Sequence, residues 1–104
     1  MQDINNKLNP VIELFNKGEK EEALAKINLI LANYKYNIDV LLLHAKICVN
    51  LNQINKANSS LTKILKLKTN NNEALKLIYV NYLKINKIDL AKKYLDKLLI
   101  IEKN

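Results

Sequence analysis

The chain has 104 residues, a formal net charge of +7 and one residue each of Gly, Pro and Cys. Because antiparallel β folds depend on turn residues, this scarcity of Gly and Pro favours helices. The single Cys excludes an internal disulfide and a Cys-based metal site. Every basic residue is Lys, and without the planar Arg fork we expect no sequence-specific binding of nucleic acid.

The first predicted helix–turn–helix unit lies within residues 4–37. Asn9-Pro10 resembles a helix cap followed by proline in the first helical position, where proline needs no amide partner. Gly18 is a typical left-handed stop for this helix. Three glutamates within residues 19–22 then open a second helix, whose amino-terminal dipole they complement.

The second and third units follow the same plan. In the middle unit, residues 38–71, apolar side chains spaced three and four apart define one helix face, Asn52 interrupts the pattern, and a second face begins at Ala57. The third unit, residues 72–104, has its break at Asn86. A long coiled coil is the competing all-α interpretation, but its apolar pattern would run on at a period of about 3.5 without these interruptions.

The chain aligns with itself at an offset of 34 residues, most clearly through Ala23, Ala57 and Ala91. The same offset aligns five further columns: Ile27, Leu61 and Leu95; Ile30, Ile64 and Leu98; Leu31, Leu65 and Leu99; Gly18, Asn52 and Asn86; Leu14, Cys48 and Tyr82. Self-similarity at such a period is the signature of a helical repeat array.

Two helices per 34 residues, with a small residue early in the second helix, resemble the tetratricopeptide repeat (TPR). The alanine column matches the family's small position, and Leu61 and Leu95 match its large position four residues on. The resemblance implies one all-α domain over residues 1–104, a short right-handed α-solenoid. Its three tandem helix–turn–helix repeats would span about residues 4–37, 38–71 and 72–104. Pro10 and Tyr79 depart from the family's pattern.

In this family the first helices of successive repeats line a concave groove that holds a peptide or helix. The resemblance therefore implies a protein–protein interaction module, such as an adaptor, an assembly factor or a small chaperone. The groove positions here are mostly apolar with scattered lysines, which suits an apolar peptide or amphipathic helix. The groove candidates are Leu8, Ile12, Leu42, Leu43, Lys46, Val49, Asn50, Lys76, Leu77, Val80, Leu83 and Lys84. Packing between neighbouring helix pairs is the alternative role for each of them.

One branch of the family binds chaperone tails by gripping a terminal carboxylate with a clamp of Lys, Asn and Arg. The clamp positions of this chain hold Leu8, Ile12, Leu43, Glu73 and Leu77. Because these side chains form no cationic clamp, we expect no recognition of a chaperone's acidic tail.

The last predicted helix ends in four consecutive apolar residues, Leu98, Leu99, Ile100 and Ile101. One helix face cannot bury all four, and each one left exposed forgoes about 1.5–3 kcal/mol of burial. We predict that a second copy, a partner protein or a downstream domain covers this terminal interface. In the last case, the chain would be the N-terminal part of a larger TPR-containing protein.

Few residues in the sequence suggest chemistry. His44 and Cys48 share a helix face and could form a base–nucleophile pair, but both also fit core positions, and we favour the core. Ser59 and Ser60 are interpreted as an exposed polar pair. We predict that the protein is not an enzyme and has no cofactor and no metal site.

The lysines are concentrated in the middle of the chain. No acidic residue occurs between Asp39 and Glu73, and Lys56, Lys63 and Lys66 form a stripe on the second helix of the middle repeat. We favour an ordinary solvated face. The alternative is a basic surface that associates with nucleic acid or an acidic protein.

The sequence also predicts the location of the protein. The stretch that begins Met1-Gln2 has no apolar signal core, and no segment approaches the length of a membrane span. A single Cys is typical of a reducing compartment. We therefore expect a cytoplasmic protein without membrane association.

Overall fold

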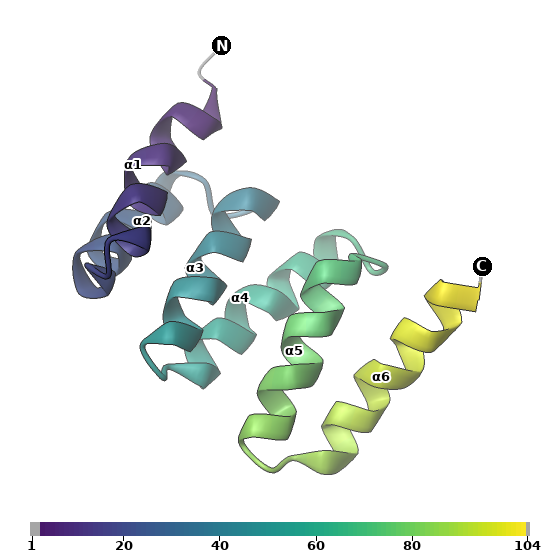
Figure 1. The fold of residues 1–104 in the computed structure, drawn as a ribbon. Helices are drawn as coiled ribbons and strands as arrows, with labels where there is room; N and C mark the ends of the chain where they lie inside the picture. The colour runs from purple at the N-terminus through teal and green to yellow at the C-terminus, as the bar shows by residue number, and fades with distance from the viewer. Residues whose placement is uncertain (1–2, 104) are drawn as a thin grey trace.

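A computed structural model of the chain describes residues 3–103, over which the backbone forms six α helices and no strand. The helices are α1 (Ile4–Asn16), α2 (Lys20–Asn33), α3 (Ile38–Asn50), α4 (Ile54–Leu67), α5 (Asn72–Lys84) and α6 (Ile88–Lys103). They pair into three hairpins that follow one another across the molecule (Figure 1). The predicted all-α class is confirmed. Residues 1, 2 and 104, which include the predicted domain limits, lie outside the described residues.

The turn after the first helix of each hairpin contains a residue with left-handed backbone. Gly18, Asn52 and Asn86 have φ of +86°, +60° and +62°, which confirms the turn column predicted from the sequence. Gly and Asn adopt this conformation at the lowest cost. The N–H of the next residue donates to a carbonyl five residues back in each turn: Glu19 to Leu14 at 2.9 Å, Gln53 to Cys48 at 2.7 Å, and Lys87 to Tyr82 at 2.8 Å. This is the Schellman arrangement, repeated three times.

The first helix begins earlier than the sequence analysis predicted. The helix α1 starts at Ile4 after the cap residue Asp3, and Pro10 lies inside it. The interpretation of Asn9-Pro10 as the start of the helix is therefore wrong. Proline in a helix interior costs about 3 kcal/mol. The earlier start buries Leu8 and part of Ile4, at about 1.5–3 kcal/mol each, which offsets that cost.

The caps of the three first helices also repeat at the 34-residue offset. The carboxylate of Asp3 accepts from the N–H of Asn5 at 3.0 Å. The side chains of Asn37 and Asn71 accept in the same way at the start of α3 and α5, from Val40 at 3.1 Å and Ala74 at 2.8 Å. Such caps satisfy amide groups that have no partner within the helix.

The alanine column lies at the centre of each hairpin. Ala23, Ala57 and Ala91 expose at most 1% of their surface, so their small side chains allow the two helices of a pair to approach closely. Two core clusters follow, one built from α1, α2 and α3 and the other from α3, α4 and α5. Because α3 contributes to both, it holds the stack together.

Candidate functional site

The solvent-facing sides of α1, α3 and α5 form one candidate surface, which we call the first-helix face. Its predicted members that are exposed or half-buried are Ile12, Leu42, Leu43, Lys46, Val49, Asn50, Lys76, Leu77, Val80, Leu83 and Lys84. The remaining groove candidate, Leu8, is 4% exposed and belongs to the first core cluster, so it presents almost no surface to a ligand.

Apolar side chains dominate the first-helix face. Ile12, Val80 and Leu83 expose between 38 and 42% of their surface. The other apolar members are half-buried and rest against the core clusters: Leu42, Leu43, Val49 and Leu77. Because the core holds these side chains in place, the face presents fixed apolar anchors with little entropy to lose on binding.

An ion pair crosses this face between α3 and α5. Lys46 Nζ lies 2.8 Å from Glu73 Oε2, with the side chains 42% and 54% exposed. At this exposure the pair contributes at most about 1 kcal/mol. The ion pair does, however, neutralise the charge of Lys46 on this face. The carboxamide of Asn50 donates to the backbone carbonyl of Lys46 at 3.0 Å.

The four residues of the predicted terminal interface differ in how far they are exposed on α6. Leu98 is 5% exposed and Ile101 is half-buried, whereas Leu99 and Ile100 expose 48% and 63% of their surface. The chain itself therefore shelters Leu98 and part of Ile101, and leaves the other two side chains in solvent.

The two ends of the stack present opposite chemistry. We call Ile88, Leu95 and Leu99 the C-terminal packing face, because the corresponding residues of α4, which a further hairpin follows, are buried or half-buried. Ile88 is 55% exposed, while its counterpart Ile54 is 9% exposed. At the other end, the residues one repeat before Val40, Leu43, Ile47 and Leu51, which belong to or pack against the first core cluster, are exposed and polar: Asn6, Asn9, Glu13 and Lys17. A polar end is the usual cap of a repeat array, and only the α1 end has one.

His44, Cys48 and Ser60 form a buried polar group between α3 and α4. His44 Nδ1 and Ser60 Oγ are hydrogen-bonded at 2.6 Å, and Cys48 Sγ lies 3.5 Å from His44 Nε2. Ser60 is 3% exposed, so its interpretation as an exposed residue is wrong, whereas Ser59 is exposed. Ser60 points towards α3 because of the register in which α4 packs against that helix. The sequence pattern does not specify this register.

The protonation states of this group are those of a packed core. Burial, with smaller contributions from Lys63 and Lys56, lowers the pKa of His44. Burial also raises the pKa of the Cys48 thiol, against a smaller opposing effect of Lys56. The two pKa shifts favour the neutral imidazole and the neutral thiol. Because the thiolate is the reactive form of cysteine, the raised pKa and full burial of Cys48 disfavour a nucleophilic role. No group of three or more His, Cys, Asp and Glu side chains within residues 3–103 could hold a metal ion.

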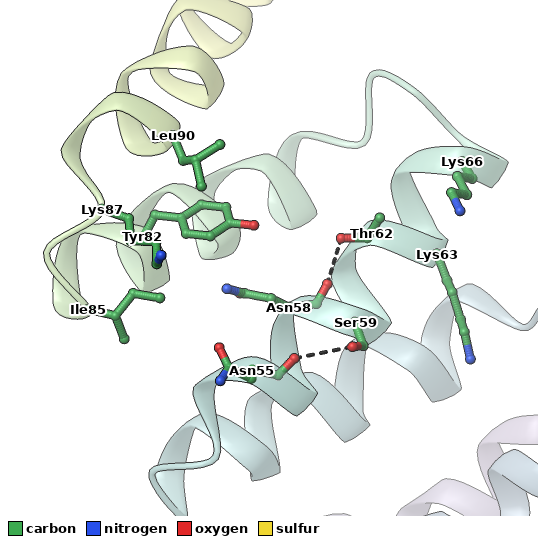
Figure 2. A pocket seen from close by; sticks show the side chains of 10 residues that line it. All are labelled: Asn55, Asn58, Ser59, Thr62, Lys63, Lys66, Tyr82, Ile85, Lys87 and Leu90. Atoms are coloured by element: carbon green, nitrogen blue, oxygen red, sulfur yellow. Dashed lines mark hydrogen bonds between the residues drawn. The ribbon is translucent and has the colours of Figure 1, made fainter.

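A cleft of about 570 Å³ separates α4 from the turn between α5 and α6 (Figure 2). On one side α4 contributes Asn55, Asn58, Ser59, Thr62, Lys63 and Lys66, and on the other stand Tyr82, Ile85, Lys87 and Leu90. We call it the basic cleft. Two lysines of the predicted stripe line it, whereas Lys56 is exposed elsewhere on α4. The lysine stripe and Lys87 lie far apart in the sequence, and only the stacking of the hairpins brings Lys63, Lys66 and Lys87 to one cleft.

Two buried carboxamides join α4 to α5 beside the basic cleft. Asn81 Nδ2 donates to Asn58 Oδ1 at 2.9 Å, and the two residues expose 1% and 7% of their surface. Leu24 and Ile47 occupy the corresponding positions between the first two hairpins. The two repeat junctions therefore differ, one apolar and one hydrogen-bonded.

Comparison with known proteins identifies the fold. No family model and no curated protein sequence matches the chain. A solved structure of a MamA mutant matches it with a TM-score of 0.81 and 14% identity, covering 94% of this chain and 72% of that one. The second TPR of Spaghetti (RPAP3), bound to the HSP90 peptide SRMEEVD, matches with a TM-score of 0.83 and 16% identity, covering 95% and 92%. The chain has the TPR fold, as its 34-residue period predicted.

Across the described residues, no helix combines the length and apolar character of a membrane span.

Proposed function

We propose that this protein is an interaction module that binds an apolar peptide or an amphipathic helix of another protein on the first-helix face. The observation that carries the proposal is the exposed apolar surface of Ile12, Val80 and Leu83, to which half-buried Leu43 and Leu77 add on α3 and α5. An amphipathic helix presents apolar side chains at intervals of three and four residues, which suits such a surface. An adaptor, an assembly factor and a small chaperone would all use it in this way. The RPAP3 structure, with its bound peptide, supports the same general role.

The proposed ligand differs in chemistry from the acidic HSP90 peptide of that structure. The family's clamp positions here are apolar apart from Glu73, whose carboxylate would repel an acidic tail. Lys46, the cation nearest to it, is already paired with that carboxylate at 2.8 Å. Affinity would therefore come from apolar anchors that fill the first-helix face, with the polar residues at its edges.

Affinity capture from native lysate tests this proposal. Leu43→Asp, Leu77→Asp and the more exposed Val80→Asp should each abolish capture of partners that the wild-type protein retains. Leu29→Asp is the matched control, because Leu29 is 73% exposed on the second helix α2. Thermal unfolding followed by circular dichroism identifies variants that have lost the fold. A folded Val80→Asp protein that captures the same partners as wild type would show the assignment of this face to be wrong.

We also propose that a second copy of the chain covers the C-terminal packing face. Exposed Ile88 and Leu99 favour burial, while the polar α1 end offers no complementary apolar surface for head-to-tail stacking. Two copies would therefore meet through the same face about a two-fold axis. Light scattering should report a dimer for wild type and a monomer for Leu99→Glu. A stable wild-type monomer, or a dimer unaffected by the substitution, would contradict this arrangement.

A cytoplasmic location is part of the same proposal. Cys48 is a free, buried thiol, which is typical of proteins in reducing compartments. Localisation of a tagged full-length protein by fluorescence microscopy tests it, and a signal confined to another compartment would contradict it.

A further inference from the structure

The three lysines of the basic cleft are a feature of this junction alone. At the 34-residue offset, the positions of Lys63, Lys66 and Lys87 are held by Leu29, Ala32 and Gln53 at the junction between the first two hairpins. That first junction has one acidic and one basic residue at the remaining cleft positions, Glu21 and Lys56, which correspond to Asn55 and Leu90. The same fold therefore forms without clustered lysines, and its architecture does not require them.

The positive charge of the basic cleft is not balanced by its own lining. No Asp or Glu belongs to the residues that line it. The ion pair of Lys46 with Glu73 lies on the first-helix face. Figure 2 shows the side chains of Lys63 and Lys66 extending from α4 away from Tyr82 and Leu90, so the positive charge lies at the rim of the cleft, where it attracts an anionic group.

Apart from Lys87, the wall of the basic cleft opposite α4 is mainly apolar. Ile85 is half-buried, and Leu90 exposes 38% of its surface. The ring of Tyr82 stands beside them and is held by stacking on Tyr94, with ring centres 5.7 Å apart. Figure 2 shows these side chains facing α4 across the cleft. An occupant that uses both walls needs an apolar side chain as well as negative charge.

We infer that the basic cleft binds an acidic segment of a partner protein, with carboxylates reaching the lysines at its rim and an apolar side chain against Ile85 and Leu90. Its volume of about 570 Å³ fits a short peptide segment. The absence of Arg disfavours a nucleic acid, because lysine binds phosphate as a point charge without bidentate geometry. This surface is distinct from the first-helix face, and its occupancy does not depend on the proposed function of that face.

A defined peptide tests the inference directly. The probe is a nine-residue peptide of Asp and Glu with one central Leu, titrated into the nitrogen-15-labelled protein while amide shifts are followed by NMR. Shift changes should concentrate on α4 and on the turn between α5 and α6. A counterpart peptide with Asn and Gln in place of the acids should cause no change. Changes spread over all exposed lysines, or equal changes with the uncharged peptide, would overturn the inference.

Charge-matched variants separate the cleft from general basicity. The triple variant Lys63→Ala, Lys66→Ala and Lys87→Ala should bind the acidic peptide about tenfold more weakly. The control variant changes three exposed lysines outside the cleft, Lys17→Ala, Lys35→Ala and Lys103→Ala, and should retain the affinity. Circular dichroism verifies that both proteins are folded. Equal weakening in the two variants would overturn the inference.

A nucleic-acid ligand is the remaining outcome to be tested. A nine-residue oligothymidylate should bind the wild-type protein more weakly than the acidic peptide at the same salt concentration. In the triple variant, the affinities for the two ligands should differ little. If the oligonucleotide bound the cleft more tightly than the peptide and lost that affinity in the triple variant, the cleft would be a nucleic-acid site and the inference would be wrong.

Discussion

The buried carboxamide pair between α4 and α5 gives the sharpest test of how the hairpins are joined. Asn81 donates to Asn58 at 2.9 Å, and both side chains are at least nine-tenths buried. Replacing Asn81 with Ile removes one partner and leaves the Asn58 oxygen buried without a donor. An unsatisfied buried polar group costs about 1–3 kcal/mol. We therefore expect Asn81→Ile alone to lower the free energy of unfolding by that amount.

The first repeat junction supplies the compensating change. Leu24 and Ile47 stand where Asn58 and Asn81 stand one repeat later, and Leu24 packs against the core cluster that contains Ile47. The double variant Asn58→Leu, Asn81→Ile copies that apolar pair. Replacing both polar partners together is close to neutral or stabilising, because no buried group is left unsatisfied. The double variant should therefore be more stable than Asn81→Ile alone.

Urea unfolding at 25 °C, followed by circular dichroism, measures all four corners of this double-mutant cycle. A favourable coupling of about 1–3 kcal/mol is expected between the two substitutions. If Asn81→Ile were as stable as wild type, or if the two effects simply added, the hydrogen bond would not determine the energy of this junction. A transition that broadens in the single variant would indicate that the third hairpin unfolds separately, as one-dimensional repeat arrays allow.

Three further predictions concern the core, the buried histidine and the caps. Ala57→Leu should destabilise the protein by about 1–3 kcal/mol because Ala57 is fully buried, whereas the same change at exposed Ala25 should leave the urea midpoint nearly unchanged. The lowered pKa of His44 means that folding favours its neutral form; its contribution to stability is complete above the unfolded pKa of about 6.5 and is lost as the pH falls through the folded pKa. His44→Ile should therefore flatten the decline of the urea midpoint as the pH falls below about 6.5, and an unchanged slope would refute the assignment. Asn71→Ala should cost about 1 kcal/mol through loss of the α5 cap, while Asn72→Ala, one residue further on and exposed, serves as the control in the same assay.

Local chemistry made the repeat architecture readable from the sequence. The left-handed turns at Gly18, Asn52 and Asn86 depend on the residue that occupies them, and the alanine column depends on side-chain size. Both signals act over a few residues, so a single chain shows them as an aligned period. The cap column was equally readable in principle, because Asp3 and Asn37 stand at the same 34-residue offset. Because proline is common in the first helical turn, Asn9-Pro10 competed with Asp3 as the predicted start of the first helix.

Features that join separate helices could not be read in this way. Whether Ser60 faces His44 or solvent depends on the register of α4 against α3, and both orientations satisfy the helical pattern. The ion pair of Lys46 with Glu73 requires the spacing of α3 from α5. Nearest-neighbour packing of the hairpins determines these distances, and no local preference specifies them.

The period, the turns, the small core positions and the apolar residues of the first-helix face all follow from the order of the amino acids. Only the packing of the helices against one another buries Leu8 and Leu98, leaves Leu99 exposed, and brings Lys63 and Lys87 to one cleft. The physical reason is that periodicity specifies which side chains share a helix face, whereas the rotation of each helix against its neighbours specifies which part of that face meets protein and which part meets solvent.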